Sequence, residues 1–415
     1  MSTLQRDVSE IREAEVETTY AWLRLLASVC LSTIGGVGMW SVVVAMPALQ
    51  AEFGVARSAV SLPYTLTMVC FGIGGVVMGR LADRFGAMPP VILATILLGI
   101  GYALAGTAPT LLQFSLVQGV LLGFGSSATF APLLADTSKW FTRRRGIAVG
   151  ICASGNYLAG AIWPPVVQHF VQTVGWRQTY IGLGVLCLIS LPLLAQAMRP
   201  RPPAATAAPA RANFGTPSQQ PFGLSLNGAQ ALLCIAGVAC CVAMSMPQVH
   251  IVAYCSDLGF GATRGAQMLS LMLASGIVSR LISGVICDRI GGLRTLLLGS
   301  ALQGLALMLF LPFDGLVSLY LISALFGLFQ GGIVPMYAII VRDYFPPKEA
   351  GVRVGIVLMA TLFGMAIGGW MSGAIFDYTG SYHAAFINGL GWNMVNAAIA
   401  LWLLLRPRRS LLARA

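Results

Sequence analysis

The sequence predicts an all-α membrane protein whose twelve transmembrane helices form two six-helix repeats. Three observations predict this fold class: the composition, a series of long apolar runs, and a loop pattern that occurs twice. Of the 415 residues, 57% are hydrophobic and only 9% are charged, whereas a soluble domain carries about 25% charged residues. The composition excludes a soluble core. The net charge of +11 is gathered in short segments between apolar runs, which argues against a nucleic-acid partner and for a lipid bilayer.

Twelve apolar runs are long enough for a membrane-spanning helix, which needs about 20 residues. Glycines and prolines inside them permit close helix contacts and kinks. The first run is long enough to remain as a span, so we expect no cleavable signal peptide. In chain order, the approximate limits are 21–48, 59–82, 89–107, 111–135, 146–171, 177–198, 225–254, 265–287, 293–311, 315–341, 352–376 and 384–406.

Basic residues predict how these spans are oriented. Of the 25 Lys and Arg residues, only Arg57, Arg177 and Arg264 fall on one side of the membrane. Arg280 lies within a span, and the others fall on the opposite side. The basic side of a membrane protein is the cytoplasmic one. We therefore expect a multi-pass protein of the cell inner (plasma) membrane with both termini in the cytoplasm.

A proline-rich segment divides the chain. Residues 199–224 hold six prolines among small and polar residues, as is typical of a linker. The predicted parts are a cytoplasmic tail (1–20), an N-terminal six-helix bundle (21–198), a cytoplasmic linker (199–224), a C-terminal six-helix bundle (225–406) and a second cytoplasmic tail (407–415).

The two halves share a loop motif. Gly, Asp, Arg and Gly follow the second span and recur after the eighth, displaced by 205 residues. A second match places Trp140-Phe141 with Gly146 and Gly150 opposite Tyr344-Phe345 with Gly351 and Gly355. Two parallel repeats imply a pseudo-twofold axis along the membrane normal. The two copies of the motif are Gly79, Asp83, Arg84, Gly86 and Gly284, Asp288, Arg289, Gly291.

With this motif, repeat and topology, nearly the whole chain resembles the major facilitator superfamily. The resemblance implies the major facilitator fold and secondary transport by alternating access. In that fold, spans one, four, seven and ten line the cavity, with two, five, eight and eleven beside them. The motif implies a cytoplasmic charge network that breaks and reforms as the halves rock, which gives these residues a role in conformational gating.

A finer resemblance involves the segment after the fourth span. Residues 140–150, followed by Gly155 and Gly160, are similar to the monocarboxylate transporter branch, of which the oxalate–formate exchangers are close relatives. The departures are also informative. Gly276 stands where that branch often has an aspartate, and residues 35–40 lack its acidic and lysine features. The eleventh span lacks the lysine of the exchangers. Proton symport and anion exchange therefore both stay open.

Arg280 is the principal candidate for substrate binding. It lies within the apolar run 269–287, about 12 Å from the Asp288-Arg289 end. A charged side chain at that depth costs roughly 2.5–3.5 kcal/mol and usually faces a polar cavity. A guanidinium can hold a carboxylate with two parallel hydrogen bonds, and Arg280 occupies the place of the branch's carboxylate-binding arginine. The alternative is an arginine that bonds to a helix carbonyl or extends to the interface.

Two residues are candidates for proton coupling. His250 lies near the outer part of the seventh span, and imidazole is the side chain that titrates closest to neutral pH. Asp257 follows it and is either its partner or a loop charge. The alternative for His250 is a hydrogen-bonded histidine near the interface.

Neutral polar residues at mid-span depth complete the predicted substrate site. A mostly apolar pocket with a few hydrogen-bonding groups suits a small ligand, although each of these side chains could instead bond between helices. The candidates are Gln118, Asn156, Tyr157, Gln330, Tyr337 and Tyr64.

The sequence thus predicts a secondary active transporter of a monocarboxylate or similar small organic anion, with proton-coupled symport expected first. The alternatives are an anion exchanger of the oxalate–formate kind and a proton-coupled drug or metabolite exporter, although Ser115 stands where exporters place an arginine. A non-transporting receptor would usually carry a soluble output domain. The sequence contains no phosphate-binding loop and no metal-ligand spacing. We therefore expect no enzyme activity, no cofactor and no metal. We expect the protein to be a monomer.

Overall fold

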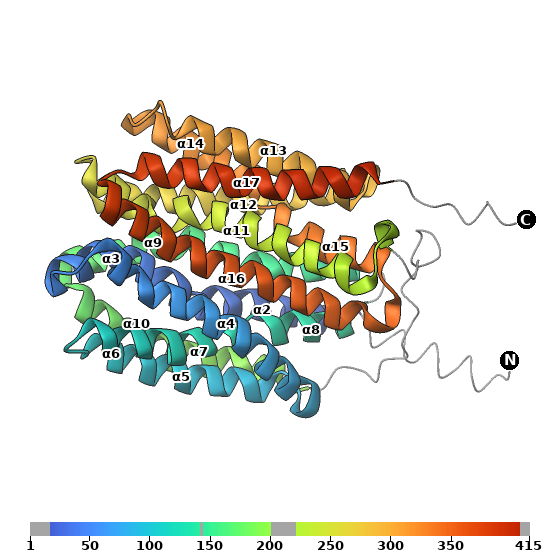
Figure 1. Cartoon of the computed structure of the whole chain (residues 1–415). Helices are drawn as coiled ribbons and strands as arrows, with labels where there is room; N and C mark the ends of the chain where they lie inside the picture. The colour runs from blue at the N-terminus through green and yellow to red at the C-terminus, as the bar shows by residue number, and fades with distance from the viewer. Residues whose placement is uncertain (1–16, 142–143, 201–220, 407–415) are drawn as a thin grey trace, which may run out of the picture. The chain divides into compact units, whose positions relative to one another are not determined.

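A computed structural model describes residues 17–141, 144–200 and 221–406. Within these ranges the chain is helical and has no strand. The described residues contain twelve candidate spans that are long and apolar enough to cross a membrane. The predicted fold class is therefore confirmed, and Figure 1 shows the helices with the labels used below. The predicted linker and tails lie mostly outside the described residues.

The helices of the first half include two interrupted spans. The first span breaks at Gly36, and the fourth contains a π-helical turn and a break at Thr129–Phe130. The elements are α2 (Thr19–Gly35), α3 (Val37–Phe53), α4 (Arg57–Phe85), α5 (Met88–Gly106), α6 (Leu111–Val117), the π-turn η1 (Gln118–Gly123), α7 (Phe124–Ala128), α8 (Ala131–Trp140), α9 (Arg145–Val174), α10 (Trp176–Ala195) and the 3₁₀ turn η2 (Gln196–Met198).

In the second half, the tenth span is interrupted at Gly331–Gly332. The elements are the 3₁₀ turn η3 (Pro221–Gly223), α11 (Leu226–Asp257), α12 (Ala262–Ile290), α13 (Gly292–Leu309), α14 (Leu316–Gln330), α15 (Ile333–Tyr344), α16 (Pro347–Thr379) and α17 (Tyr382–Leu405). Among these, α11 packs along both α16 and α17 (Figure 1).

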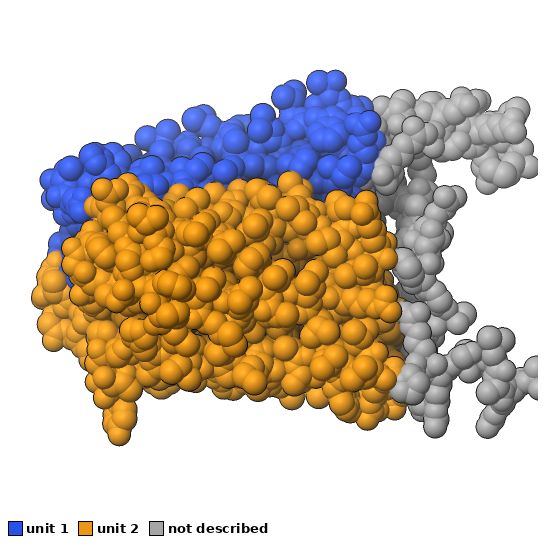
Figure 2. Space-filling view, turned by 90° about the horizontal axis from the view of Figure 1, so that it is seen from above, with its two compact units in different colours: residues 1–49, 69–210 blue, residues 50–68, 211–415 orange. Residues whose placement is uncertain are grey.

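The chain forms two compact units, coloured separately in Figure 2. The first contains residues 1–49 and 69–210, and the second contains residues 50–68 and 211–415. The first turns of α4 therefore pack within the second unit, although they precede the linker in sequence. The bundle and linker boundaries predicted above stay a prediction.

Each unit buries aromatic side chains and turns aliphatic ones outward. In the first unit, the Phe114 and Tyr180 rings lie 5.4 Å apart, and in the second the Phe310 and Phe386 rings stack at 4.7 Å. By contrast, Leu112 is 70% exposed and Val317 is 82% exposed. Apolar side chains exposed along membrane-spanning helices contact lipid, and the helices satisfy their own backbone hydrogen bonds.

The internal repeat is visible in the backbone. Gly86 and Gly291 end α4 and α12 with φ of 93° and 84°, a conformation that favours glycine. Each donates its N–H at 2.8 Å to the carbonyl four residues earlier, on Ala82 or Cys287. The breaks in the fourth and tenth spans are displaced by about the same interval as the motif. The repeated sequence positions thus have equivalent local structures.

Glycines bring α14 into close contact with α12. A Cβ atom on Gly327 would lie 1.9 Å from the Met272 carbonyl oxygen, and one on Gly331 would lie 2.5 Å from the Gly276 carbonyl oxygen. Both obstacles are backbone atoms, which cannot rotate away. This contact fixes α12 against the interruption of the tenth span.

We expect Gly327→Ala to destabilise the protein by about 1–3 kcal/mol, as overpacking of a well-packed interface does. Gly284→Ala is the matched control, because a Cβ at that position of α12 meets nothing within 4 Å. Thermal unfolding of the purified protein in detergent measures both. Equal unfolding temperatures for the two variants would contradict the close contact.

Candidate functional site

Arg280 lies on α12 beside the interruption of the tenth span. Its side chain is partly buried, and its Nε donates to the Gly331 carbonyl oxygen at 3.3 Å. That carbonyl belongs to the C-terminal end of α14, where the helix dipole is negative and attracts a cation. A bond of this kind, to a helix carbonyl, is the alternative to substrate binding that the sequence left open for Arg280. Because it is made by Nε, it also orients the plane of the guanidinium.

The backbone around Arg280 is held by further contacts. Ser279 accepts a hydrogen bond from the Gly332 N–H at 3.1 Å, so α12 also satisfies a backbone donor at the break. Gly276, one turn before Arg280, lies against Gly331. Any side chain at Gly331 would therefore meet the Gly276 backbone, which keeps the two glycines in close contact.

Gln330 is buried at the end of α14, next to the carbonyl that Arg280 contacts. It is fully inaccessible, and its side-chain oxygen and nitrogen have no hydrogen-bond partner among the described residues. Buried amides are normally hydrogen-bonded to protein or ordered water. A buried amide without a described partner is suited to a polar ligand or to water.

The first unit holds three of the predicted substrate-binding residues. Gln118 begins the π-turn of the fourth span and donates its Nε2 to the Gly38 carbonyl oxygen at 2.8 Å. Asn156 lies 3.8 Å from the Met39 sulfur, through its Nδ2, and Tyr157 is half-buried beside it on α9. π-turns occur frequently at functional sites. These contacts bring α3 together with the fourth span and with α9.

Tyr337 belongs to a network between helices. Its hydroxyl donates to Asn396 at 2.7 Å, and the Asn396 amide donates to the Ser300 hydroxyl at 3.1 Å. The network joins α15, α17 and α13, and all three side chains are fully buried. This geometry favours an interhelical role for Tyr337 over contact with a substrate.

The proton-coupling candidates, His250 and Asp257, are connected through two other side chains. His250 Nδ1 lies 3.0 Å from the Tyr382 hydroxyl, and that hydroxyl accepts a bond from Arg57 at 3.1 Å. Arg57 Nη2 reaches both Asp257 carboxylate oxygens, at 3.0 and 3.1 Å. Asp257 is therefore an ion-pair partner of Arg57, not an isolated loop charge. All four residues lie in the second unit.

Tyr64 lies next to the same cluster. A Cβ on Gly369 would lie 3.0 Å from the Tyr64 ring, and the Gly369 carbonyl oxygen lies 2.7 Å from His250 Nε2. The Tyr64 hydroxyl is buried and has no hydrogen-bond partner among the described residues. The structure thus groups Tyr64 with His250 and does not show it in contact with Arg280.

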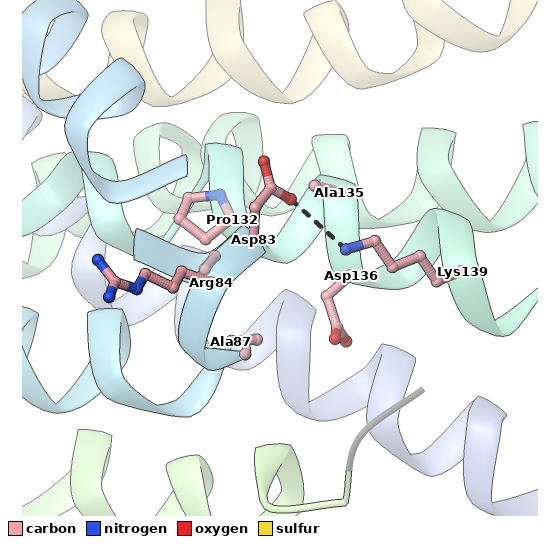
Figure 3. Close-up of a pocket in the computed structure, with 9 residues that line it drawn as sticks. Asp83, Arg84, Ala87, Pro132, Ala135, Asp136 and Lys139 are labelled. Atoms are coloured by element: carbon pink, nitrogen blue, oxygen red, sulfur yellow. Dashed lines mark ion pairs between the residues drawn. The ribbon is translucent and has the colours of Figure 1, made fainter. Parts of the chain in front are cut away.

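Three residues of the first motif copy, Asp83, Arg84 and Gly86, line a pocket of about 190 Å³ in the first unit. Asp83 pairs with Lys139 at 3.5 Å, and Figure 3 shows the Arg84 side chain directed away from this pair.

In the second copy of the motif, Asp288 and Arg289 are exposed at the end of α12. Gly79 and Gly284 each face open space, so the two copies agree there as well. The pocket is an accessory feature of the helix ends and does not include Arg280.

A buried ion pair near this pocket was not singled out from the sequence. Arg24 Nε and Nη2 bond to the two Asp136 oxygens at 2.8 and 3.0 Å, and both residues are at most 5% exposed. The Arg24 guanidinium also lies 4.9 Å from the centre of the Trp140 ring. The only signal was an aspartate close to the end of an apolar run, and nothing in the sequence pairs it with a residue 112 positions earlier.

Comparisons with known proteins agree with this architecture. The family model described as Major Facilitator Superfamily matches residues 29–322 and 284–414. Monocarboxylate transporter 13 of Bos taurus is 29% identical, covering 81% of this chain and 78% of its own. The MFS-type transporter pynF of Aspergillus niger is 24% identical, covering 96% and 91%. A crystal structure of a mutant of the nucleoside transporter NupG has a TM-score of 0.74 at 15% identity, covering 92% and 99%.

The fold and these matches define a multi-pass membrane transporter. The chain belongs to the major facilitator superfamily. The family and the similar proteins are transporters, not enzymes. A small molecule is therefore its substrate, as predicted.

Proposed function

We propose that this transporter carries a monocarboxylate or a similar small organic anion, and that Arg280 binds its carboxylate. The observation that carries the proposal is the position of Arg280. It lies deep in a membrane span, with its Nε on the Gly331 carbonyl where the tenth span is interrupted. Discontinuous helices commonly form the substrate sites of transporters. The similarity to monocarboxylate transporters supports the substrate class.

Gln330, Gln118, Asn156 and Tyr157 are the proposed neutral contacts for the rest of the substrate. Gln330 has the strongest support, since its buried amide has no described protein partner. We propose proton symport as the energy source, with His250 as the proton site. Transport by alternating access, a monomeric state, cytoplasmic termini and residence in the inner membrane complete the proposal.

Uptake by proteoliposomes tests the substrate and the coupling together. The purified protein is reconstituted and offered radiolabelled lactate, pyruvate, formate, oxalate, benzoate and larger acids, with and without an inward proton gradient. We expect a monoacid to enter and the gradient to stimulate its uptake. If no acid enters, while an amphipathic drug or metabolite is carried, the anion proposal is wrong and the exporter alternative replaces it.

Anion exchange is the second candidate, and Gly276 favours it. Glycine has no side chain, so the position one turn before Arg280 offers no proton acceptor for symport. Exchange predicts that uptake requires a counter-anion inside the vesicles and is insensitive to the proton gradient. The same proteoliposomes, loaded with unlabelled acid, distinguish the two mechanisms.

A further inference from the structure

The first residues of α4 are held in the second unit by a carboxylate from another helix. Asp377 on α16 accepts hydrogen bonds from the Arg57 and Ser58 backbone N–H groups at 2.7 and 2.8 Å. These are two of the donors that a helix leaves unsatisfied at its N-terminus, and a carboxylate there also interacts favourably with the helix dipole. Asp377 thus caps α4 although it lies 320 positions along the chain.

The Arg57 side chain makes a second attachment. Its guanidinium holds Asp257 with two hydrogen bonds, donates to Tyr382, and lies 4.7 Å from the centre of the Phe376 ring. The side chain is 8% exposed, whereas that of Asp257 is 35% exposed. Arg57, Asp257, Asp377 and Tyr382 form what we call the α4 clasp. It joins α4 to α11, α16 and α17.

The hydrogen bonds that run from the clasp to His250 have one direction when the imidazole is neutral. Arginine only donates, so the Tyr382 oxygen accepts from Arg57, and its own proton can then point to His250 Nδ1. A carbonyl only accepts, so His250 Nε2 carries a proton and donates to Gly369. In the neutral imidazole, Nδ1 is then the acceptor for the Tyr382 hydroxyl. In this protonation state every member of the chain has a partner.

We propose that protonation of His250 weakens the α4 clasp. A proton on Nδ1 would point at the Tyr382 oxygen, so the hydroxyl would lose its acceptor. The new imidazolium would also be one hydroxyl away from the Arg57 guanidinium, and like charges repel. Both effects weaken the bond between Arg57 and Tyr382. The charged and titratable groups around His250 are Arg57 and Tyr64 of α4, Asp257 and Tyr254 of α11, Asp377 of α16, and Tyr382 of α17.

The clasp is suited to a role in transport because of where it acts. Residues 50–68 precede the linker in sequence but pack with residues 211–415. A weaker clasp would therefore hold this segment of the first repeat less tightly to the second unit. This role rests on the proton coupling proposed above, whereas the hydrogen-bond switch itself needs no substrate.

Hydrogen–deuterium exchange tests the switch without any substrate. The full-length protein in detergent is labelled at about pH 4 and about pH 8, either side of the range in which imidazole titrates, with labelling times scaled for the chemical exchange rate. We expect the protection of peptides from residues 50–68 to fall roughly tenfold at the lower pH, as for the loss of one charge-assisted hydrogen bond. In His250→Gln, which keeps an acceptor and a donor but cannot become charged, protection should not depend on pH.

Two matched controls use groups at the same end of the second unit. His383→Gln changes an exposed histidine that bonds to Leu311, and it should keep the full pH response. Tyr382→Phe removes the hydroxyl that links Arg57 to His250, and it should lower the protection of residues 50–68 at both pH values. Tyr254→Phe is its control: it removes a buried hydroxyl without a described partner and should leave that protection unchanged. The proposal is overturned if native protection is the same at both pH values, or if His250→Gln responds like the native protein. A positive exchange result with no acid uptake would instead overturn only the proposed transport function.

Discussion

Arg280→Lys is expected to lower uptake of the preferred monoacid about a hundredfold or more. Lysine keeps the charge but presents a compact ammonium that cannot form two parallel bonds to a carboxylate. It also lacks an Nε–H, so the bond to the Gly331 carbonyl oxygen is lost and the cation is no longer oriented. Loss of a charge-assisted, bidentate interaction in a partly buried site corresponds to about 3 kcal/mol, which is a factor of about a hundred. Initial uptake rates in proteoliposomes measure it.

Arg264→Lys is the matched control for this substitution. Arg264 is on the same helix, is exposed, and contacts Gln267. The same chemical change there should leave uptake within about twofold, because exposed contacts contribute little. If Arg280→Lys transports as well as Arg264→Lys does, then Arg280 is a structural residue of the break between α14 and α15, and the carboxylate site lies elsewhere.

Asp136→Ala is expected to destabilise the protein by about 3–5 kcal/mol. The substitution would leave the Arg24 guanidinium, which is 2% exposed, without its carboxylate partner. Removing one member of a buried pair leaves an uncompensated charge, and that cost exceeds the net stabilisation by the pair. Chemical or thermal unfolding of the purified protein measures the change, and a large fall in the yield of folded protein is expected.

Asp83→Ala is the control, because Asp83 also pairs with a basic residue near the same pocket. Its side chain is 70% exposed and Lys139 is 39% exposed, so the expected change is within about 1 kcal/mol. Replacing both Arg24 and Asp136 by leucine should restore most of the stability, since no charge is then left unpaired. Equal effects of Asp136→Ala and Asp83→Ala would show that burial of the Arg24 pair is unimportant.

The fold was predictable because its signals are local and repeated. A span needs only a run of apolar residues, and lipid excludes almost every alternative to a helix. The motif was predictable for the same reason: Gly86 and Gly291 end helices in the same conformation. Arg280 was identifiable because a charge in an apolar run is costly wherever it points.

The candidate site was only partly predictable from sequence. Tyr337 and Gln330 are both polar residues of the tenth span. Only packing distinguishes Tyr337, which is hydrogen-bonded, from Gln330, whose amide has no partner among the residues that the structure describes. In the same way, the sequence shows Arg57 only as a basic residue at the start of a span. Its partners follow from the packing of α4 against α16 and α17. Side-chain partners in a helical bundle depend on helix rotation and on contacts hundreds of residues apart, and composition records neither.

The sequence alone therefore determined the class of this protein: a duplicated, twelve-span membrane transporter with a cation in its eighth span. The physical reason is that hydrophobicity, helix length and glycine conformation are properties of short segments. Only the tertiary structure decided which charges meet. It paired Arg24 with Asp136, linked His250 to Asp257 through Tyr382 and Arg57, and placed Arg280 at the end of α14. Those contacts exist because close packing brings distant residues within hydrogen-bonding distance.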